Sequence, residues 1–583
     1  MRLFKTLLFL LITVLLSVAI EAVTFTTTKE IKTIHNSLQN SLLNRQNFSK
    51  DASLSEIIYQ EKTTKGIMNL LIKSEKKTFK HLSHKKFIQR VYKRSHYLPL
   101  WFNHKGVKKS NLNDLFNTIE ADVTLNQSGR LYKRFKNLKF KISKLKTRNL
   151  EKELQLDLEL SSLYRSYLGY HLYGAINWSN FQQRLRRLKR QKISADWVTV
   201  NRKYDIANLM FTTPISELVK ETTPTSFGYK KMIKELARLK KVQKRGGWKK
   251  IPNSSQLKAG RSGSVVKQLT KRLESEGDYL CRHKGSKYTY NNCLKKAVKR
   301  FQKRHGLYPS GKMNSGTRSR LNLSVNWKIN KLLLNIDRIK RLPKQPETRY
   351  VFVNIPEFRL HYREKGRDKL NMRVVVGDKK HHTPIFSNKI SFIVLNPYWL
   401  IPDSIVQKEM IPKMLKNPNY LEQRGYEVRK NYLLSSPAIN TKKINWARVL
   451  KNKQTKRYKF MQPPGPKNAL GKIKFKFPNQ FAVYLHDTPA KKYFKKGVRA
   501  FSHGCIRIAE PRAFLATFAP HERSVNYGRA KRILRGKRKT QLNLAHPVPV
   551  HIVYLTAWIN SDGLLHYRSD IYNYDSKQHR VSY

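Results

Sequence analysis

Acidic residues are scarce in this 583-residue chain: 37 aspartates and glutamates stand against 119 lysines and arginines, and the formal net charge is +82. So large an excess goes far beyond what solubility requires and attracts polyanions. Nucleic acid is the usual partner of a strongly basic chain. Here, however, the basic residues are spread along nearly every segment instead of forming one stripe. A compositional bias and attraction to an anionic surface therefore both stay open.

Long apolar runs are also scarce, and only the start of the chain carries one. Residues 1–22 combine a basic beginning, an apolar run from Leu7 to Ile20 and small residues suited to cleavage, which predicts a secretory signal peptide. The run is short for a membrane span of about 20 residues, so we expect export and keep an uncleaved anchor as the alternative. An exported chain meets anionic membrane surfaces, and we expect no nucleic-acid partner.

Cysteine is the third scarce residue, with three in the whole chain. Cys281 and Cys293 lie 12 positions apart, whereas Cys505 is far from both. Three cysteines in an exported protein usually mean one disulfide and one free thiol. A bond between Cys281 and Cys293 would stabilise a small domain by about 3 kcal/mol in the chain-entropy treatment. Cys505 would then remain reduced.

The length and the 39% hydrophobic content predict two to four domains with real cores. Residues 23–50 are polar and irregular, as expected for a linker. Residues 51–248 place apolar side chains three or four positions apart, which predicts a helical scaffold domain.

Glycine and proline then separate a smaller unit from this scaffold. Gly246-Gly247 and Pro252 mark the break, and the unit covers residues 251–323. We expect a helix within residues 324–346 to return to the scaffold. The smaller unit is therefore predicted to be an insertion in the scaffold.

After Pro346 the apolar pattern changes from helical spacing to alternation, which predicts strands. We expect a mainly β-sandwich domain over residues 347–573. Residues 401–457 interrupt the strands with prolines and helix-like runs, and so long a connection predicts an inserted lid. The fold class is thus multidomain α+β. The expected strands are 350–354, 359–362, 371–376, 390–395 and 481–485.

Chemistry concentrates near the C-terminal end, where Cys505 lies in a Ser-His-Gly-Cys-Ile-Arg string and His486 lies 19 positions earlier. A nearby imidazole can lower the pKa of a thiol and hold the thiolate as an ion pair, or act as its base. The glycine before the cysteine lets main-chain N–H groups of Gly504 and Cys505 point at a developing oxyanion. The alternative is a cysteine that serves only as a small buried hydrophobe.

The local pattern also predicts where these side chains lie. A strand from Phe481 to His486 would place Ala482, Tyr484 and His486 on one face. Pro511 predicts a helix start shortly after Cys505, and the dipole of that helix would favour a thiolate.

The residues around this site resemble the L,D-transpeptidase catalytic domain, also called the YkuD domain, over Tyr350–Tyr572. Its histidine, spacer and Ser-His-Gly-Cys-x-Arg motif match at His486 and Ser502–Arg507. Residues 87–101 and 157–178 are similar to the scaffold of the large Gram-negative members. Residues 260–322 resemble a small helical peptidoglycan-binding repeat. Further matching phrases occupy 353–356, 375–377, 383–384, 396–399, 464–468 and 477–479.

The resemblance implies a cysteine acyltransferase that acts on peptidoglycan without a cofactor or metal. In this family the thiolate attacks the peptide bond after the L-centre of diaminopimelate and releases D-alanine from a tetrapeptide stem. The acyl group then passes to the side-chain amine of another stem, which gives a 3-3 cross-link. The implied partners are peptidoglycan stem peptides and glycan, and the implied compartment is the periplasm.

On this basis Cys505 is assigned as the nucleophile and His486 as its base or ion-pair partner. Asp487 should point to the opposite face, so a backbone carbonyl is expected to orient the imidazole. His503 either lines the oxyanion region or packs and shapes the loop. Arg507 either binds a stem-peptide carboxylate or forms a buried ion pair. The residues expected only to line the site are Ser502, Gly504 and Tyr484.

Several alternatives stay open. Water could be the acceptor, which would give an L,D-carboxypeptidase, or a protein amine could be attached to the wall. A polybasic wall-binding protein without activity is the non-enzymatic alternative. His486, His503 and Cys505 could instead bind zinc, although the family needs no metal.

Overall fold

The computed structural model describes residues 53–75, 84–200, 202–281, 288–344, 347–578 and 580. The predicted leader and the linker up to residue 50 lie outside these ranges. Within them, no helix is long and apolar enough to cross a membrane. The chain divides into two compact units, one of Met1–Ala121, Arg130–Leu168 and Asp205–Leu218, the other of Asp122–Gly129, Gly169–Tyr204 and Val219–Tyr583.

The first unit is helical around a buried carboxylate. Both oxygens of Asp157, on helix α7, accept main-chain hydrogen bonds, from the N–H of Leu100 at 3.0 Å and of Trp101 at 2.8 Å. Asp157 thereby fixes the loop before the hairpin of β1 (Phe102–Asn103) and β2 (Gly106–Val107). The helices are α3 (Leu54–Glu75), α4 (Lys85–Arg94), α5 (Lys109–Ala121), α6 (Arg130–Ser143), α7 (Leu150–Tyr173), which continues into the second unit, and α9 (Ile206–Thr212).

In the second unit two helices far apart in sequence share one core. Helix α11 (Tyr229–Lys244) and helix α15 (Val325–Ile339) bury apolar side chains against strand β3 (Arg349–Asn354) and the hairpin of β15 (Ala557–Ile559) and β16 (Leu565–Tyr567). Helix α8 (Trp178–Arg190) also belongs to this unit, and α10 (Ile215–Thr222) runs from the first unit into the second.

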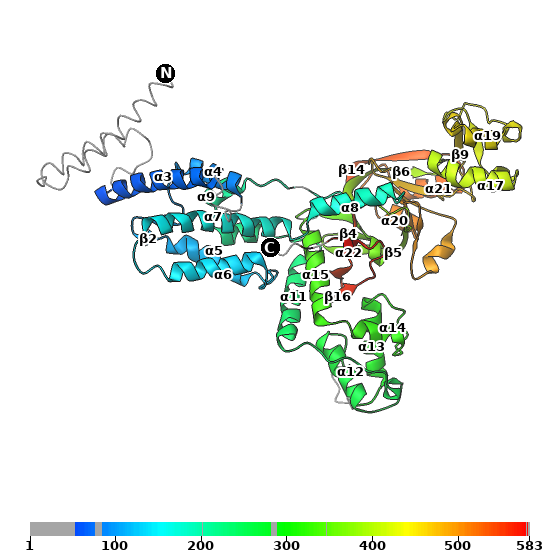
Figure 1. Ribbon diagram of the computed structural model, residues 1–583. Helices are drawn as coiled ribbons and strands as arrows, with labels where there is room; N and C mark the ends of the chain where they lie inside the picture. The colour runs from blue at the N-terminus through cyan, green and yellow to red at the C-terminus, as the bar shows by residue number, and fades with distance from the viewer. Residues whose placement is uncertain are drawn as a thin grey trace, which may run out of the picture. The chain divides into compact units, whose positions relative to one another are not determined.

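A group of three α-helices and one short 3-10 helix, with a core of its own, lies between α11 and α15 in the sequence (Figure 1). The group is therefore inserted between two helices that pack together. It consists of η2 (Ser255–Leu257), α12 (Ser264–Ser275), α13 (Asn292–Arg304) and α14 (Ser315–Leu321).

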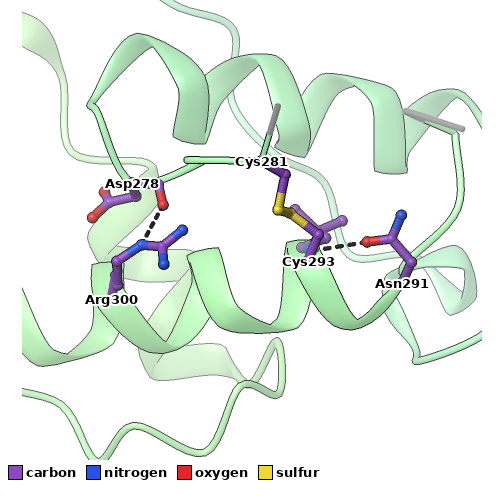
Figure 2. Close-up of a disulfide and its surroundings, with 6 residues drawn as sticks. Asp278, Cys281, Asn291, Cys293 and Arg300 are labelled. Carbon is purple, nitrogen blue, oxygen red and sulfur yellow. Dashed lines mark hydrogen bonds between the residues drawn. A yellow bond between two sulfur atoms is a disulfide. The ribbon is translucent and has the colours of Figure 1, made fainter. Parts of the chain in front are cut away.

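A disulfide joins Cys281 to Cys293 across this group, as Figure 2 shows. Cys293 lies in the first turn of α13, where the side chain of Asn291 caps the helix by accepting from the N–H of Leu294 at 2.9 Å. Two turns on, Arg300 donates to the carbonyl of Asp278 at 2.6 Å. The bond thus ties the segment after α12 to the start of α13, while Cys505 is the free cysteine.

Removing this disulfide should loosen the inserted group. In the chain-entropy treatment, a loop of this length stabilises the fold by about 3 kcal/mol. We therefore expect a Cys281→Ser/Cys293→Ser protein to be cleaved faster by a protease within residues 251–323. Quantitative limited proteolysis checks this, and an unchanged cleavage rate would contradict it.

The C-terminal part is built on one mixed nine-stranded sheet, in the order β12-β5-β13-β11-β10-β6-β14-β3-β4. Strand β4 also pairs with β5, so eight of the strands close into a ring. Strands in addition to β3 are β4 (Arg359–Glu364), β5 (Arg367–Gly377), β6 (Phe386–Leu395), β10 (Ile473–Lys476), β11 (Leu485–His486), β12 (Ala500–Ser502), β13 (Ile506–Ile508) and β14 (Thr540–Val553).

The predicted β-sandwich is therefore corrected to a single sheet closed on itself. The closure depends on β5, whose first half pairs with β4 and whose second half pairs with β13 and β12. Apolar side chains from the inner face of these strands form the core. Around the sheet lie η3 (Ile355–Glu357), η7 (Lys491–Lys495), α20 (Pro511–Ala516), α21 (Tyr527–Arg535) and α22 (Tyr574–Lys577).

The segment predicted as a lid forms a small subdomain with its own apolar core. A three-stranded sheet, β7 (Trp399–Leu400), β9 (Lys459–Gln462) and β8 (Glu427–Arg429), holds it together. Figure 1 shows its helices α17 and α19 gathered beside β9. Its helical elements are α16 (Asp403–Ile405), the π-helix η4 (Val406–Met410), α17 (Ile411–Lys416), α18 (Tyr420–Arg424), η5 (Thr441–Lys443), α19 (Trp446–Lys451) and η6 (Thr455–Arg457).

Candidate active site

Three neighbouring strands place a row of charged and titratable side chains on the outer face of the sheet. Lys474 on β10 pairs with His486 on β11, and His486 pairs with Arg507 on β13. The next row, Phe475, Leu485 and Ile506, packs into the core. Because side chains alternate along a strand, the row Lys474–His486–Arg507 faces away from that core.

Cys505 directly precedes β13 and lies on the same side as this row. Its side chain is half-buried, and its Sγ lies 3.8 Å from the carbonyl oxygen of Ala482. The charges of Lys474 and Arg507 both act on the thiol. The ring of Tyr484 lies 5.5 Å from that of His486 between centroids, and Lys474 Nζ lies 3.7 Å from the Tyr484 centroid. The structure thus gathers Tyr484, His486 and Cys505.

The predicted strand from Phe481 is wrong in length, because β11 contains only Leu485 and His486. The side-chain oxygen of Asn479 accepts from the N–H groups of Phe481 and Val483 at 3.0 and 3.2 Å, which bends the chain. Ala482 accordingly has φ of +52°. Ala482 therefore does not share a strand face with Tyr484 and His486.

The turn before the thiol is fixed by hydrogen bonds. Ser502 Oγ donates to the carbonyl of Cys505 at 2.5 Å and accepts from the Gly504 N–H at 3.3 Å. Thr383 Oγ1 donates to the carbonyl of Gly504 at 2.8 Å, and the φ of +108° at Gly504 favours glycine there. The Gly504 N–H is thus occupied by Ser502. No hydrogen bond from the Cys505 N–H is found among the described residues.

The expectation that a helix dipole stabilises the Cys505 thiolate is wrong, because no helix begins at Cys505. Strand β13 separates the cysteine from α20, although α20 does begin at Pro511 as predicted. The thiol therefore lies beside a strand start and not at a helix start.

His486 is buried and neutral. Its Nδ1 donates to the main-chain carbonyl of Asp487 at 2.5 Å, which leaves Nε2 as the acceptor. Burial lowers the pKa of His486 to about 3, and the positive charge of Arg507 adds to this. Asp487 itself accepts from Lys491 Nζ at 2.6 Å and from the Lys472 N–H at 2.9 Å. A backbone carbonyl, and no acidic side chain, orients the ring.

The thiol of Cys505 is also neutral at rest. Burial raises its pKa, and a hydrogen bond with the Tyr484 backbone and the charge of Lys474 offset only part of this. A neutral imidazole and a neutral thiol on the same side of the sheet fit the general-base role of His486 better than a preformed ion pair.

The reactivity of Cys505 should follow this ionisation. Because the pKa of the thiol is raised, its thiolate fraction grows about tenfold per pH unit through the neutral range. We expect the rate of alkylation by iodoacetamide to rise steadily from about pH 6 to 9, measured by mass spectrometry. A plateau across that range would indicate a thiolate–imidazolium pair and contradict the assignment. Cys505→Ala should show no labelling.

The structure gives His503 and Arg507 contacts that differ from those expected from the sequence. His503 Nε2 lies 2.5 Å from Glu409 Oε1 on η4, and its ring lies 4.5 Å from that of His381. His503 therefore connects the cysteine loop to the lid. Arg507 has a buried Nε without a partner, and its guanidinium carbon lies 6.0 Å from the Tyr493 centroid. Within the described ranges no carboxylate pairs with Arg507.

Two residues of the site were missed from the sequence. Glu409 carried no signal, because its contact with His503 depends on how the lid folds. Lys474 could have been found, since it alternates with apolar residues in the segment Ile473–Lys476. No group of three ligating side chains in the described part of the chain could hold a metal ion.

Comparisons with known proteins agree with this organisation. Residues 348–525 match the L,D-transpeptidase catalytic domain, residues 86–236 match a scaffold domain, and residues 262–321 match a domain described as "Putative peptidoglycan binding domain". A Haemophilus influenzae protein named "Putative L,D-transpeptidase" is 34% identical over 245 residues. The match covers 42% of this chain and 48% of that protein, so the chain spans about half the length of this relative.

Solved structures show a weak overall likeness. An L,D-transpeptidase from Mycobacterium smegmatis has a TM-score of 0.18 at 11% identity, and covers 35% of this chain and 58% of its own. An L,D-transpeptidase from Xylanimonas cellulosilytica has a TM-score of 0.17 at 13% identity, over 52% of this chain and 100% of its own.

Proposed function

We propose that this chain, which carries an L,D-transpeptidase catalytic domain with scaffold and peptidoglycan-binding domains, forms 3-3 cross-links in peptidoglycan through an acyl-enzyme on Cys505. The observation that supports the proposal is the half-buried free thiol of Cys505 on the same side of the sheet as the oriented, neutral imidazole of His486. The peptidoglycan-binding domain supports the choice of substrate. The basic charge of the chain suits stem-peptide carboxylates and anionic membrane surfaces.

In the first half-reaction, His486 Nε2 takes the thiol proton as the sulfur attacks the carbonyl carbon after the L-centre of diaminopimelate. The carbonyl oxygen becomes an oxyanion, and the N–H of Cys505 is the main-chain donor left for it. The C–N bond then breaks, and His486 returns the proton to the amine of the leaving D-alanine. A thioester on Cys505 remains.

In the second half-reaction, the side-chain amine of an acceptor stem attacks the thioester. His486 accepts a proton from this amine, the C–S bond breaks, and the thiolate leaves and is protonated. The products are an amide cross-link and the free enzyme. Water in place of the amine would give a tripeptide, and a protein amine would give wall attachment.

Disaccharide-tetrapeptides provide the test. The purified protein should convert them to a dimer with release of D-alanine, both followed by mass spectrometry. A product dominated by tripeptide would instead assign an L,D-carboxypeptidase. No D-alanine release at all would refute both activities. Such a reaction requires an extracytoplasmic location, which we propose to be the periplasm, with the leader as a signal or tether.

A further inference from the structure

The imidazole of His486 lies between two cations. Lys474 and Arg507 are its direct partners in the register of β10 and β13, on either side of β11. Neighbouring strands lie about 4.8 Å apart, so the backbones of both basic residues lie about one strand spacing from the backbone of His486. The positive charges of Arg507 and Lys474 both disfavour the protonated imidazole.

Neither cation is neutralised by the protein. In the ranges that the structure describes, no Asp or Glu side chain pairs with Lys474 or Arg507. Burial lowers the pKa of Lys474 to about 8, which leaves it mostly protonated at neutral pH. Arg507 in addition has the buried, unpartnered Nε. A desolvated cation without a counter-ion is costly, and a bound anion would relieve that cost.

The proposed chemistry makes this cost larger. When His486 takes the proton of Cys505, three positive groups stand in one row across three strands. The thiolate, and after it the oxyanion of the tetrahedral intermediate, offsets only one of them until His486 passes the proton to the leaving amine. The charges of Lys474 and Arg507 stay uncompensated throughout, and a substrate anion beside them would balance them while His486 carries the proton.

We propose that Lys474 and Arg507 form a carboxylate-binding subsite that holds the terminal carboxylate of the donor peptide. This inference rests on the proposed function and names which carboxylate the site recognises. In a donor that ends one residue after the scissile bond, the terminal carboxylate is only three bonds from the carbonyl carbon under attack. The other carboxylates of a stem lie further along its side chains.

The subsite explains two properties at once. A donor must end one residue after the scissile bond, because a longer peptide carries an amide at that place. The donor also supplies the negative charge that allows His486 to accept the proton of Cys505. Charge-assisted hydrogen bonds to a carboxylate are the strong kind, so their loss should cost about 10- to 100-fold in affinity.

Binding to a Cys505→Ala protein tests the subsite without any reaction. The ligands are one tetrapeptide stem with a free D-alanine carboxylate and its counterpart ending in a carboxamide, titrated by calorimetry. The free acid should bind about 10- to 100-fold more tightly. Adding Lys474→Met should remove this preference, whereas Lys474→Arg should keep most of it. Lys476→Met is the matched control, because Lys476 lies on the same strand two positions on and contacts the Phe392 ring.

Equal binding of acid and amide to the Cys505→Ala protein would overturn the subsite, as would an unchanged preference in Lys474→Met. A parallel kinetic arm separates this failure from failure of the proposed function. In the Cys505 protein, Lys474→Met should raise KM for the acid donor but not KM for the amide donor, whereas kcat should change to a similar extent for both donors because Lys474 also acts on the thiol. A preference in binding without D-alanine release would retain the subsite and refute the transpeptidase proposal.

Discussion

Replacement of Cys505 by alanine is expected to abolish dimer formation and D-alanine release, by a factor of at least about 10⁴. The sulfur is the atom that forms the thioester, and the other two cysteines are tied in the disulfide. No neighbouring group can take its place. The assay is product quantification by mass spectrometry with disaccharide-tetrapeptide donor and acceptor.

The fold of this variant should stay intact. The Cys505 thiol makes only weak hydrogen bonds, with the Ala482 carbonyl at 3.8 Å and with Tyr484, and the turn is held by Ser502 and Thr383. Thermal unfolding followed by circular dichroism should therefore match that of the unsubstituted protein. Dimer formation by a folded Cys505→Ala protein would refute the nucleophile assignment.

Replacement of His486 by asparagine should reduce the rate of acyl-enzyme formation by about 10² to 10⁴ at neutral pH. The asparagine amide can still donate to the Asp487 carbonyl, as Nδ1 does now. Its amide oxygen can accept a hydrogen bond but is not basic enough to take the thiol proton, so the thiol of Cys505, whose pKa is raised, has no base.

The loss of acyl-enzyme formation rate in His486→Asn should become smaller as the pH rises, because the thiolate of Cys505 then forms without a base. Stopped-time mass spectrometry of the acyl-enzyme across pH gives this profile. His521→Asn is the matched control: His521 lies in the same domain and pairs with Glu364 at 3.2 Å. A deficit that does not change with pH would mean that His486 supports the fold and does not act as the base.

The candidate site could be predicted from the sequence further than the architecture. The motif around Cys505 indicates the proposed nucleophile, and the strand pattern before His486 indicates that Tyr484 and His486 share a face. The orientation of the ring by a carbonyl was also expected, since Asp487 had to point away. These are local properties, which depend on a few adjacent residues.

The closure of the sheet could not be predicted, because it depends on pairings between distant segments. Strand β5 changes partners along its length, from β4 to β13. Nothing in the local pattern of Arg367–Gly377 marks that change. Two facing sheets and one closed sheet place the same alternating residues inside, so the two cannot be separated by alternation alone.

The neighbours of Cys505 and His486 could not be predicted from the sequence for a related reason. Lys474 belongs to the site because β10 lies beside β11 in a particular register, and a slip of one residue would turn it into the core. The role of Ser502 also required the structure, since its hydroxyl occupies the Gly504 N–H that was expected to bind the oxyanion. Side-chain hydrogen bonds of Asn479 shortened β11 in the same way.

The intact mass of the protein after incubation with a tetrapeptide donor shows whether an acyl-enzyme forms on Cys505. The account predicts an added mass equal to the donor less D-alanine, located on Cys505 by peptide mapping and lost when an acceptor stem is supplied. An added mass on any other residue would contradict this mechanism. So would release of D-alanine that continues when Cys505 is replaced and that leaves no covalent adduct on the unsubstituted protein.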